Sequence, residues 1–197
     1  MSPGRGTTSR TRRRRRASKK TAEMTAASPG VPVFFFDGAR FGLRPALGRR
    51  WAKRGGRPVA VVRTGYLNFY AYSAVCPATG EDFTLLLPRV CTALMNVFLE
   101  QMADFLGGRE CILVMDRAGW HVSKDLVVPP NIRIVLPPPY SPELNPVERL
   151  WQWLKRHAIL NRLHLTLDGV TDAVEGCLRS ATAPFLKSLC RCNYLLH

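Results

Sequence analysis

The chain has 197 residues, which suits one domain of ordinary size. Hydrophobic residues make up 46% of it, a share that excludes an intrinsically disordered chain. Lys and Arg number 29 against 14 Asp and Glu, and the net charge of +15 makes nucleic acid the first candidate partner.

The N-terminal segment predicts a disordered basic tail over residues 1–29, because it lacks an apolar period and contains five consecutive arginines, Arg12 to Arg16. This tail either contacts DNA phosphates without reading sequence or lies upstream of a true start at Met24. Residues 1–30 carry nine basic residues and one acidic residue, which leaves +7 of the +15 on the remaining chain. The body is therefore basic too, although arginine-rich coding is an alternative origin of part of that charge.

The sequence also disfavours a membrane protein and a zinc-binding protein. No apolar stretch reaches the roughly 18 to 20 residues that span a bilayer, so we expect a cytoplasmic protein without a membrane partner. The six cysteines indicate reduced thiols. A zinc site can be drawn from Cys177, Cys190, Cys192 and His197, but the spacing fits no common finger and the apolar neighbours favour packing.

The sequence predicts mainly β-strands in the first half of the folded chain. The run VPVFFFD (31–37) predicts a buried strand that ends on Asp37 and delivers this acid to a sheet edge. Residues 42–58 are rich in Gly, Pro and Arg and predict a loop. Two strands, 59–64 and 67–76, joined by a tight turn at Gly65, and a third at 79–88 then form a hairpin meander.

The second half alternates helices and strands. A helix is predicted over 89–106, stopped by Gly107 and Gly108. The run ECILVMD (110–116) predicts a buried strand ending on Asp116. The remaining predicted elements are a short helix at 123–127, a strand at 131–137, a helix from Pro142 that carries Glu148, and one or two covering helices in the last thirty residues.

This order predicts an α/β fold: a mixed sheet flanked by helices. We divide the chain into the basic tail (1–29), a catalytic domain (30–165) and a C-terminal helical cover of the same domain (166–197).

Asp37, Asp116 and Glu148 form the candidate catalytic and metal site. Two aspartates at strand ends and a glutamate on a helix are the oxygen ligands that a two-metal site for phosphoryl transfer needs, with two Mg²⁺ or Mn²⁺ ions about 3.5 to 4 Å apart. Each acid alone is equally well a turn former or a helix cap. The three together, in a basic chain, favour the functional interpretation.

The block LPPPYSPELNPVERLWQWLK and the upstream VMDRAGWH carry a resemblance. From about Phe34 to about His157 the chain resembles the catalytic domain of the mariner superfamily of DDE transposases, particularly the bacterial insertion-sequence branch. The resemblance implies a ribonuclease-H-like fold and places the three acids on Asp37, Asp116 and Glu148, the last two 32 positions apart. Fold analogy alone would not establish the function.

The chain departs from that family in two ways. Many relatives carry an Asp-Glu pair at the first acid, whereas Asp37 is followed by Gly38. The family usually has an N-terminal helix-turn-helix region that reads the ends of the element, and here only the basic tail precedes the catalytic domain. A separate helix-turn-helix polypeptide is therefore an expected partner.

Other residues have auxiliary candidate roles. Asn145 caps the helix of Glu148, and His121 contacts a phosphate unless it is a packed or capping residue. Trp51, Trp151 and Trp153 stack on a flipped base or, as we prefer, belong to the core. The candidate DNA-backbone patch, whose alternative is a solvated loop, consists of Arg44, Arg49, Arg50, Lys53, Arg54 and Arg57.

The sequence thus predicts a transposase subunit or fragment that cleaves DNA at element ends and transfers the strand to target DNA, with a homodimer as one arrangement for holding two ends. The alternatives are a truncated, inactive remnant that binds DNA by charge, or a stand-alone ribonuclease-H-like nuclease.

Overall fold

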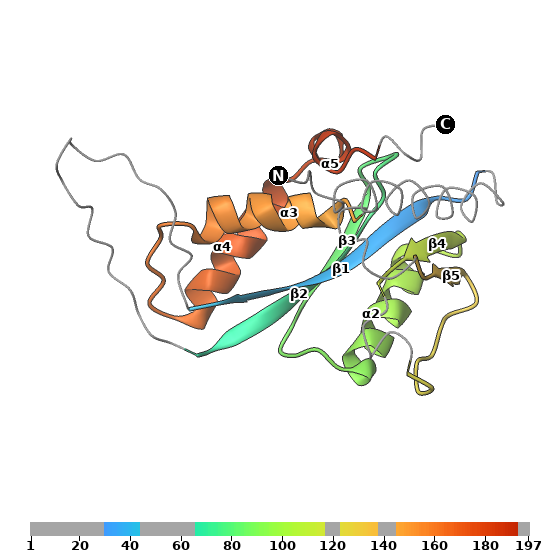
Figure 1. Cartoon of the computed structure of the whole chain (residues 1–197), viewed down its shortest axis with the longest axis horizontal. Helices are drawn as coiled ribbons and strands as arrows, with labels where there is room; N and C mark the ends of the chain where they lie inside the picture. Colours follow the sequence, from blue (N-terminus) through green and yellow to red (C-terminus); the bar gives the residue numbers. More distant parts are fainter. Residues whose placement is uncertain (1–29, 44–65, 117–122, 138–144, 193–197) are drawn as a thin grey trace, which may run out of the picture.

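The structure, a computed structural model, describes residues 30–43, 66–116, 123–137 and 145–192 (Figure 1). One five-stranded sheet in the order β3-β2-β1-β4-β5 carries helices on both faces. The elements are β1 (Val33–Gly42), β2 (Asn68–Val75), β3 (Asp82–Leu87), α2 (Thr92–Phe105), β4 (Cys111–Val114), β5 (Ile132–Val135), α3 (Val147–Leu154), the π-helical turn η3 (Lys155–Ile159), α4 (Leu167–Ser180) and α5 (Ala183–Leu189). The predicted mixed sheet with flanking helices is confirmed.

β1 is the central strand of the sheet. It pairs antiparallel with β2 and parallel with β4, while β3 and β5 lie outside them. The antiparallel hairpin of β2 and β3 confirms that part of the predicted meander. The expected strand at 59–64, the turn at Gly65 and most of the expected loop at 42–58 lie outside the described residues.

The prediction that the first strand ends on Asp37 at a sheet edge is wrong. β1 continues to Gly42, so Asp37 lies in the middle of the central strand. The strand continues because Ala39 and Phe41 keep the inward alternation and because β1 pairs with β2 as far as the Gly42–Asn68 pair. Local sequence does not predict this extension, because two of the five added residues, Gly38 and Gly42, are glycines, which are depleted in strands.

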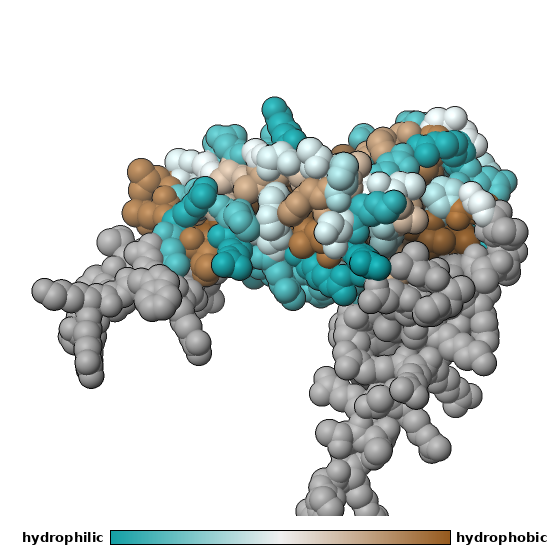
Figure 2. All heavy atoms as spheres, turned by 90° about the horizontal axis from the view of Figure 1, so that it is seen from above, coloured by the Kyte–Doolittle hydropathy of each residue, from teal (hydrophilic) through white to brown (hydrophobic). Residues whose placement is uncertain are grey.

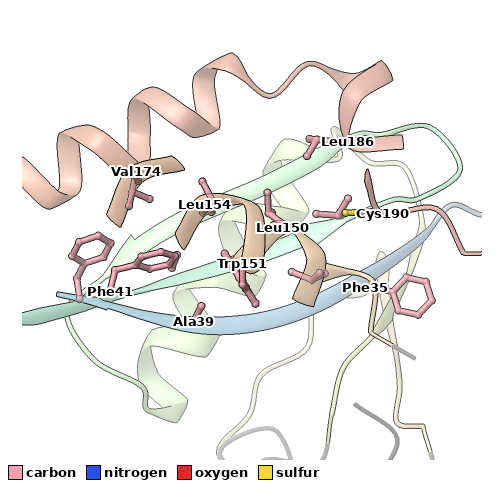
Figure 3. Close-up of a cluster of buried hydrophobic side chains, with 14 of the residues drawn as sticks. Phe35, Ala39, Phe41, Leu150, Trp151, Leu154, Val174, Leu186 and Cys190 are labelled. Carbon is pink, nitrogen blue, oxygen red and sulfur yellow. The ribbon is translucent and has the colours of Figure 1, made fainter. Parts of the chain in front are cut away.

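The two faces of the sheet bury two separate cores. Phe34 and Phe36 point to one face, where α2 covers them with Met95, Phe98 and other residues; we call this the α2-side core. Phe35 points to the opposite face. There it joins the α3-side core, which is shown in part in Figure 3 and includes Ala39, Phe41, Leu150, Trp151, Leu154, Val174, Leu186 and Cys190. Alternation along β1 therefore decides which layer each side chain enters.

Two helix predictions need correction. Residues 123–127 form a turn and not a helix, because the side chain of Asn96 binds the Asp125 carbonyl at 3.0 Å and the Val127 N–H at 3.0 Å. The helix expected from Pro142 begins at Val147, after Pro146; residues 138–144 lie outside the described part of the chain. The helix expected at 89–106 is confirmed as α2, and Gly107 and Gly108 follow it with positive φ.

The C-terminal helices pack on the same core as the sheet. Val170 and Val174 of α4 and Leu186 of α5 are fully or almost fully buried in the α3-side core. Of the described helices, none has both the length and the apolarity that a membrane crossing requires.

All six cysteines are free thiols, and several of them fill core positions. Cys190 and Cys192 are buried in the α3-side core, and Cys177 packs against it. Burial raises the pKa of the Cys190 thiol to about 12. His197, the fourth member of the drawn zinc set, lies outside the described residues.

Gly80 lies in the turn between β2 and β3 and packs directly against the start of α5. Its replacement therefore tests this contact. Its φ is +82°, and an added Cβ would overlap the carbonyl of Ala183 at the start of α5. Gly108 has a similar φ of +85° but open space around it. We expect Gly108→Ala to cost about 1 to 2 kcal/mol of backbone strain, and Gly80→Ala at least about 2 kcal/mol more, in urea unfolding. Equal losses would show that α5 does not pack on this turn.

Candidate active site

The three acids come from three elements that meet on one face of the sheet. Phe35 of β1 is level with Val114 of β4 in their parallel register. Asp37 lies two residues further along β1, on the same face as Phe35 and Ala39 of the α3-side core. β4 ends at Val114 and not on Asp116 as predicted, so Asp116 follows that strand by two residues. Asp116 still lies near enough to Asp37 for its charge to act on the Asp37 carboxyl. Glu148 lies in the first turn of α3, which packs on that face.

The helix that carries Glu148 is tied to β1 by Asn145. Its side-chain amide donates to the carbonyl of Phe36 at 2.9 Å, and its side-chain oxygen accepts the N–H of Val147 at 3.1 Å. The second bond satisfies one of the free N–H groups at the start of α3. Asn145 was predicted to cap this helix, but the N-cap position is Pro146, and Asn145 acts from one residue before it. The first bond, between positions 109 residues apart, was not foreseen in the sequence.

Asp37 is half-buried, and both of its carboxylate oxygens accept hydrogen bonds. The indole N–H of Trp151 donates to Oδ2 at 2.8 Å, and the Gly38 N–H donates to Oδ1 at 2.9 Å. Asp116 and Glu148 are exposed.

Burial raises the pKa of the Asp37 carboxyl to about 6. The negative charges of Glu148 and Asp116 raise this pKa further, whereas the hydrogen bonds from Trp151 and Gly38 oppose the rise. The fold thus brings Asp116 and Glu148 within electrostatic range of the half-buried carboxylate of Asp37.

The donor set suits a hard divalent cation, since it contains only carboxylate oxygens and a nearby positive charge would relieve both the burial and the repulsion. Within the described residues, however, no three His, Cys, Asp or Glu side chains are arranged to hold a metal ion. Asp116 and Glu148 thus act electrostatically on Asp37, but the three side chains are not arranged so that one metal ion could contact all of them.

Arg149, the neighbour of Glu148, joins α3 to the C-terminal segment. One guanidinium nitrogen donates to the carbonyls of Leu189 and Arg191, at 3.3 and 2.7 Å. These bonds satisfy carbonyls at the end of α5, where a helix lacks internal partners. Sequence reasoning missed this role because the partners are backbone atoms about forty residues away.

The tryptophans on α3 are core residues and not exposed stacking platforms. Trp151 is 2% exposed and meets Phe41 edge-on at 6.1 Å between ring centroids. Trp153 is partly buried against Phe185 and His157. Trp51, His121 and the six basic residues of the candidate DNA patch lie outside the described residues.

A mixed five-stranded sheet with helices on both faces is the ribonuclease-H-like fold. Residues 32–171 match the model of the DDE superfamily endonuclease, and the chain belongs to that family. The resemblance found in the sequence is thereby confirmed.

Two curated relatives are similar in sequence. The chain is 39% identical over 109 residues to the uncharacterized protein y4pE/y4sA of Sinorhizobium fredii, a match that covers 55% of this chain and 78% of that protein. It is 30% identical over 138 residues to the insertion element IS630 uncharacterized 39 kDa protein of Shigella sonnei. This second match covers 68% of this chain but only 40% of the IS630 protein.

Among solved structures, the catalytic domain of Mos1 mariner transposase superimposes with a TM-score of 0.63 at 12% identity, covering 90% of this chain and 85% of that chain. The Mos1 strand transfer complex gives a TM-score of 0.69 at 15% identity, with 90% and 56% covered. These matches show the fold. The chain spans a little over half of that longer Mos1 protein.

Replacing Asp37 should stabilise the metal-free protein at neutral pH. The raised pKa of Asp37 means that, between about pH 4 and 6, the folded state keeps a proton that the unfolded state releases, so stability falls as pH rises through this window. In EDTA, we expect Asp37→Asn to be more stable than wild type by roughly 1 to 3 kcal/mol at pH 8, and by almost nothing at pH 4.

Thermal or urea unfolding across this pH range measures the effect, with Asp104→Asn, an exposed aspartate on α2, as the matched control. A less stable Asp37→Asn protein at pH 8 would mean that the bonds from Trp151 and Gly38 outweigh the cost of burial.

Replacing Asn145 should destabilise the junction between β1 and α3. Asn145→Ala removes both bonds and leaves the partly buried Phe36 carbonyl without this donor, so we expect a loss of about 1 to 3 kcal/mol in urea unfolding. Gln152→Ala, at an exposed position on the same helix, is the control and should change stability by less than about 0.5 kcal/mol. An unchanged Asn145→Ala protein would contradict the junction.

Proposed function

We propose that the chain is the catalytic part of an insertion-sequence transposase, which cuts DNA at the ends of its element and joins the freed 3′ ends to target DNA. The observation that carries the proposal is that the helix of Glu148 is bonded to Asp37 through Trp151, and that Glu148 and Asp116 both lie near enough for their charges to act on the Asp37 carboxyl. Membership of the DDE endonuclease family and similarity to an IS630 protein support it.

Asp37, Asp116 and Glu148 are the residues proposed to hold two divalent ions, Mg²⁺ or Mn²⁺. Mos1 paired-end complexes have been solved with Mg and with Mn, which supports this choice. Bound ions would supply Lewis-acid chemistry to the scissile phosphate and to the attacking hydroxyl.

The protein's own part in this chemistry is positional. Asp37 is held on a central strand by two hydrogen bonds, whereas Asp116 follows β4 and Glu148 is carried by α3. Acids on separate rigid elements keep their spacing when the substrate changes from water to a 3′ hydroxyl. One site therefore serves both cleavage and joining.

DNA is the proposed partner, as element end and as target. The chain's net charge of +15 favours a polyanion, and exposed Lys155, Arg156 and Arg162 follow the helix of Glu148. Seen from the side of α3 to α5, hydrophilic and apolar residues are interspersed (Figure 2). The basic patch from Arg44 to Arg57 remains a proposal. So do a separate helix-turn-helix polypeptide for recognition, a homodimer, and action at the bacterial nucleoid in the cytoplasm.

An inactive remnant is the less favoured alternative. It rests on Gly38 in place of the glutamate that many relatives carry, but the backbone N–H of Gly38 donates to Asp37, and any residue other than proline would supply the same N–H. The stand-alone nuclease is disfavoured by the similarity of the chain to an insertion-element protein.

Nicking of supercoiled plasmid DNA tests the proposal. The purified protein should nick DNA only with Mg²⁺ or Mn²⁺, while Asp116→Asn and Glu148→Gln abolish nicking and leave DNA binding in place. Asp104→Asn, which changes the charge equally on an exposed face of α2, should remain active. Salt-sensitive DNA binding by the wild-type protein without any nicking would identify a remnant.

A further inference from the structure

Trp151 makes an unusual contact for a core residue. Its ring is 2% exposed and packs in the α3-side core, yet its indole N–H donates to Oδ2 of Asp37 at 2.8 Å. The bond joins residues 114 positions apart. A buried indole N–H usually finds some acceptor, and a backbone carbonyl would serve. Here the acceptor is the first of the three acids.

The position of Trp151 on α3 adds a second consequence. It follows Glu148 by three residues, so the two side chains lie on neighbouring parts of the same helical face. The indole bond therefore fixes the helix of Glu148 relative to Asp37. Together with the bond from Asn145 to the Phe36 carbonyl, it ties α3 to two consecutive residues of β1.

The indole N–H of Trp151 carries no charge, so it can bind the Asp37 carboxylate without neutralising it. A Lys or Arg at this place would neutralise Asp37 and compete with a cation, whereas an indole N–H orients the carboxylate and leaves its charge intact. Each carboxylate oxygen has two lone pairs, and the bonds from Trp151 and Gly38 use one on each. Both oxygens thus keep a lone pair for a further ligand.

We infer that Trp151 is a positioning residue of the active site: its indole N–H sets the orientation of the Asp37 carboxylate and its place relative to Glu148 before a divalent ion binds. This inference rests on the proposed function, because it assumes that the acids bind such ions. Hydrogen bonds that orient metal ligands typically change metal affinity by about 10 to 100-fold when they are lost.

The competing explanation is that Trp151 only fills the core. A change at one atom can distinguish the two roles of Trp151. Packing depends on the shape of the ring, whereas positioning of Asp37 depends on the indole N–H. Replacing Trp151 by 3-benzothienylalanine exchanges the N–H for sulfur in a ring of nearly the same shape. Trp151→Phe is the simpler variant. Trp153→Phe is the matched control on the same helix, where the ring makes tilted contacts with Phe185 and His157.

The first measurement needs no metal. In ¹⁵N–¹H NMR spectra of the metal-free protein, the indole N–H resonance assigned by its loss in Trp151→Phe should shift on Asp37→Asn, while the Trp153 resonance stays in place. An unmoved Trp151 resonance would overturn the inference.

The second measurement is the Kd for Mn²⁺, by calorimetry or electron paramagnetic resonance. We expect the benzothienylalanine protein to bind Mn²⁺ about 10 to 100-fold more weakly than wild type, with the melting temperature nearly unchanged, and Trp153→Phe to bind within about twofold. Equal Mn²⁺ affinity of the wild-type and benzothienylalanine proteins would overturn the inference alone. Absence of Mn²⁺ binding by the wild-type protein would instead overturn the proposed function on which it rests.

Discussion

The central position of β1 is the constraint on which the remaining structure depends. Because β1 is paired on both edges and covered on both faces, each of its side chains is assigned to one layer by alternation. Phe34 and Phe36 enter the α2-side core, and Phe35 and Ala39 enter the α3-side core. Asp37 occupies a position on the same face as Phe35 and Ala39, where an apolar residue would carry no free-energy penalty for burying a charge. The raised pKa of Asp37 reflects this penalty, and the penalty falls where α3 and the end of β4 bring two more acids close to Asp37.

Local patterns in the sequence were sufficient for much of this arrangement. The short apolar runs before Asp37 and Asp116 predicted two buried strands, and the period around Glu148 predicted its helix. These signals are strong because burial on a sheet or along one helical face repeats over several residues. The family followed from the same segments, because the motif around Glu148 contains both the candidate acid and the helix that carries it.

Most of the errors and omissions involve partners distant in sequence. β1 extends past Asp37 because Phe41 meets Phe69 of β2, and residues 123–127 form a turn because Asn96 binds their backbone. The bond from Trp151 to Asp37 spans more than a hundred residues. No window of local sequence contains such pairs. Trp151 was placed correctly in the core from its spacing, but its polar contact required the register of β1 against α3.

The central claim is that Asp37, Asp116 and Glu148 form one site for divalent ions. The most direct test is the anomalous scattering of Mn²⁺ in a crystal of the full chain with a short DNA duplex that carries an element end. The account predicts anomalous peaks bounded by the carboxylates of the three acids, with the bond from Trp151 to Asp37 retained. Mn²⁺ bound elsewhere on the chain, with these carboxylates left apart, would contradict it.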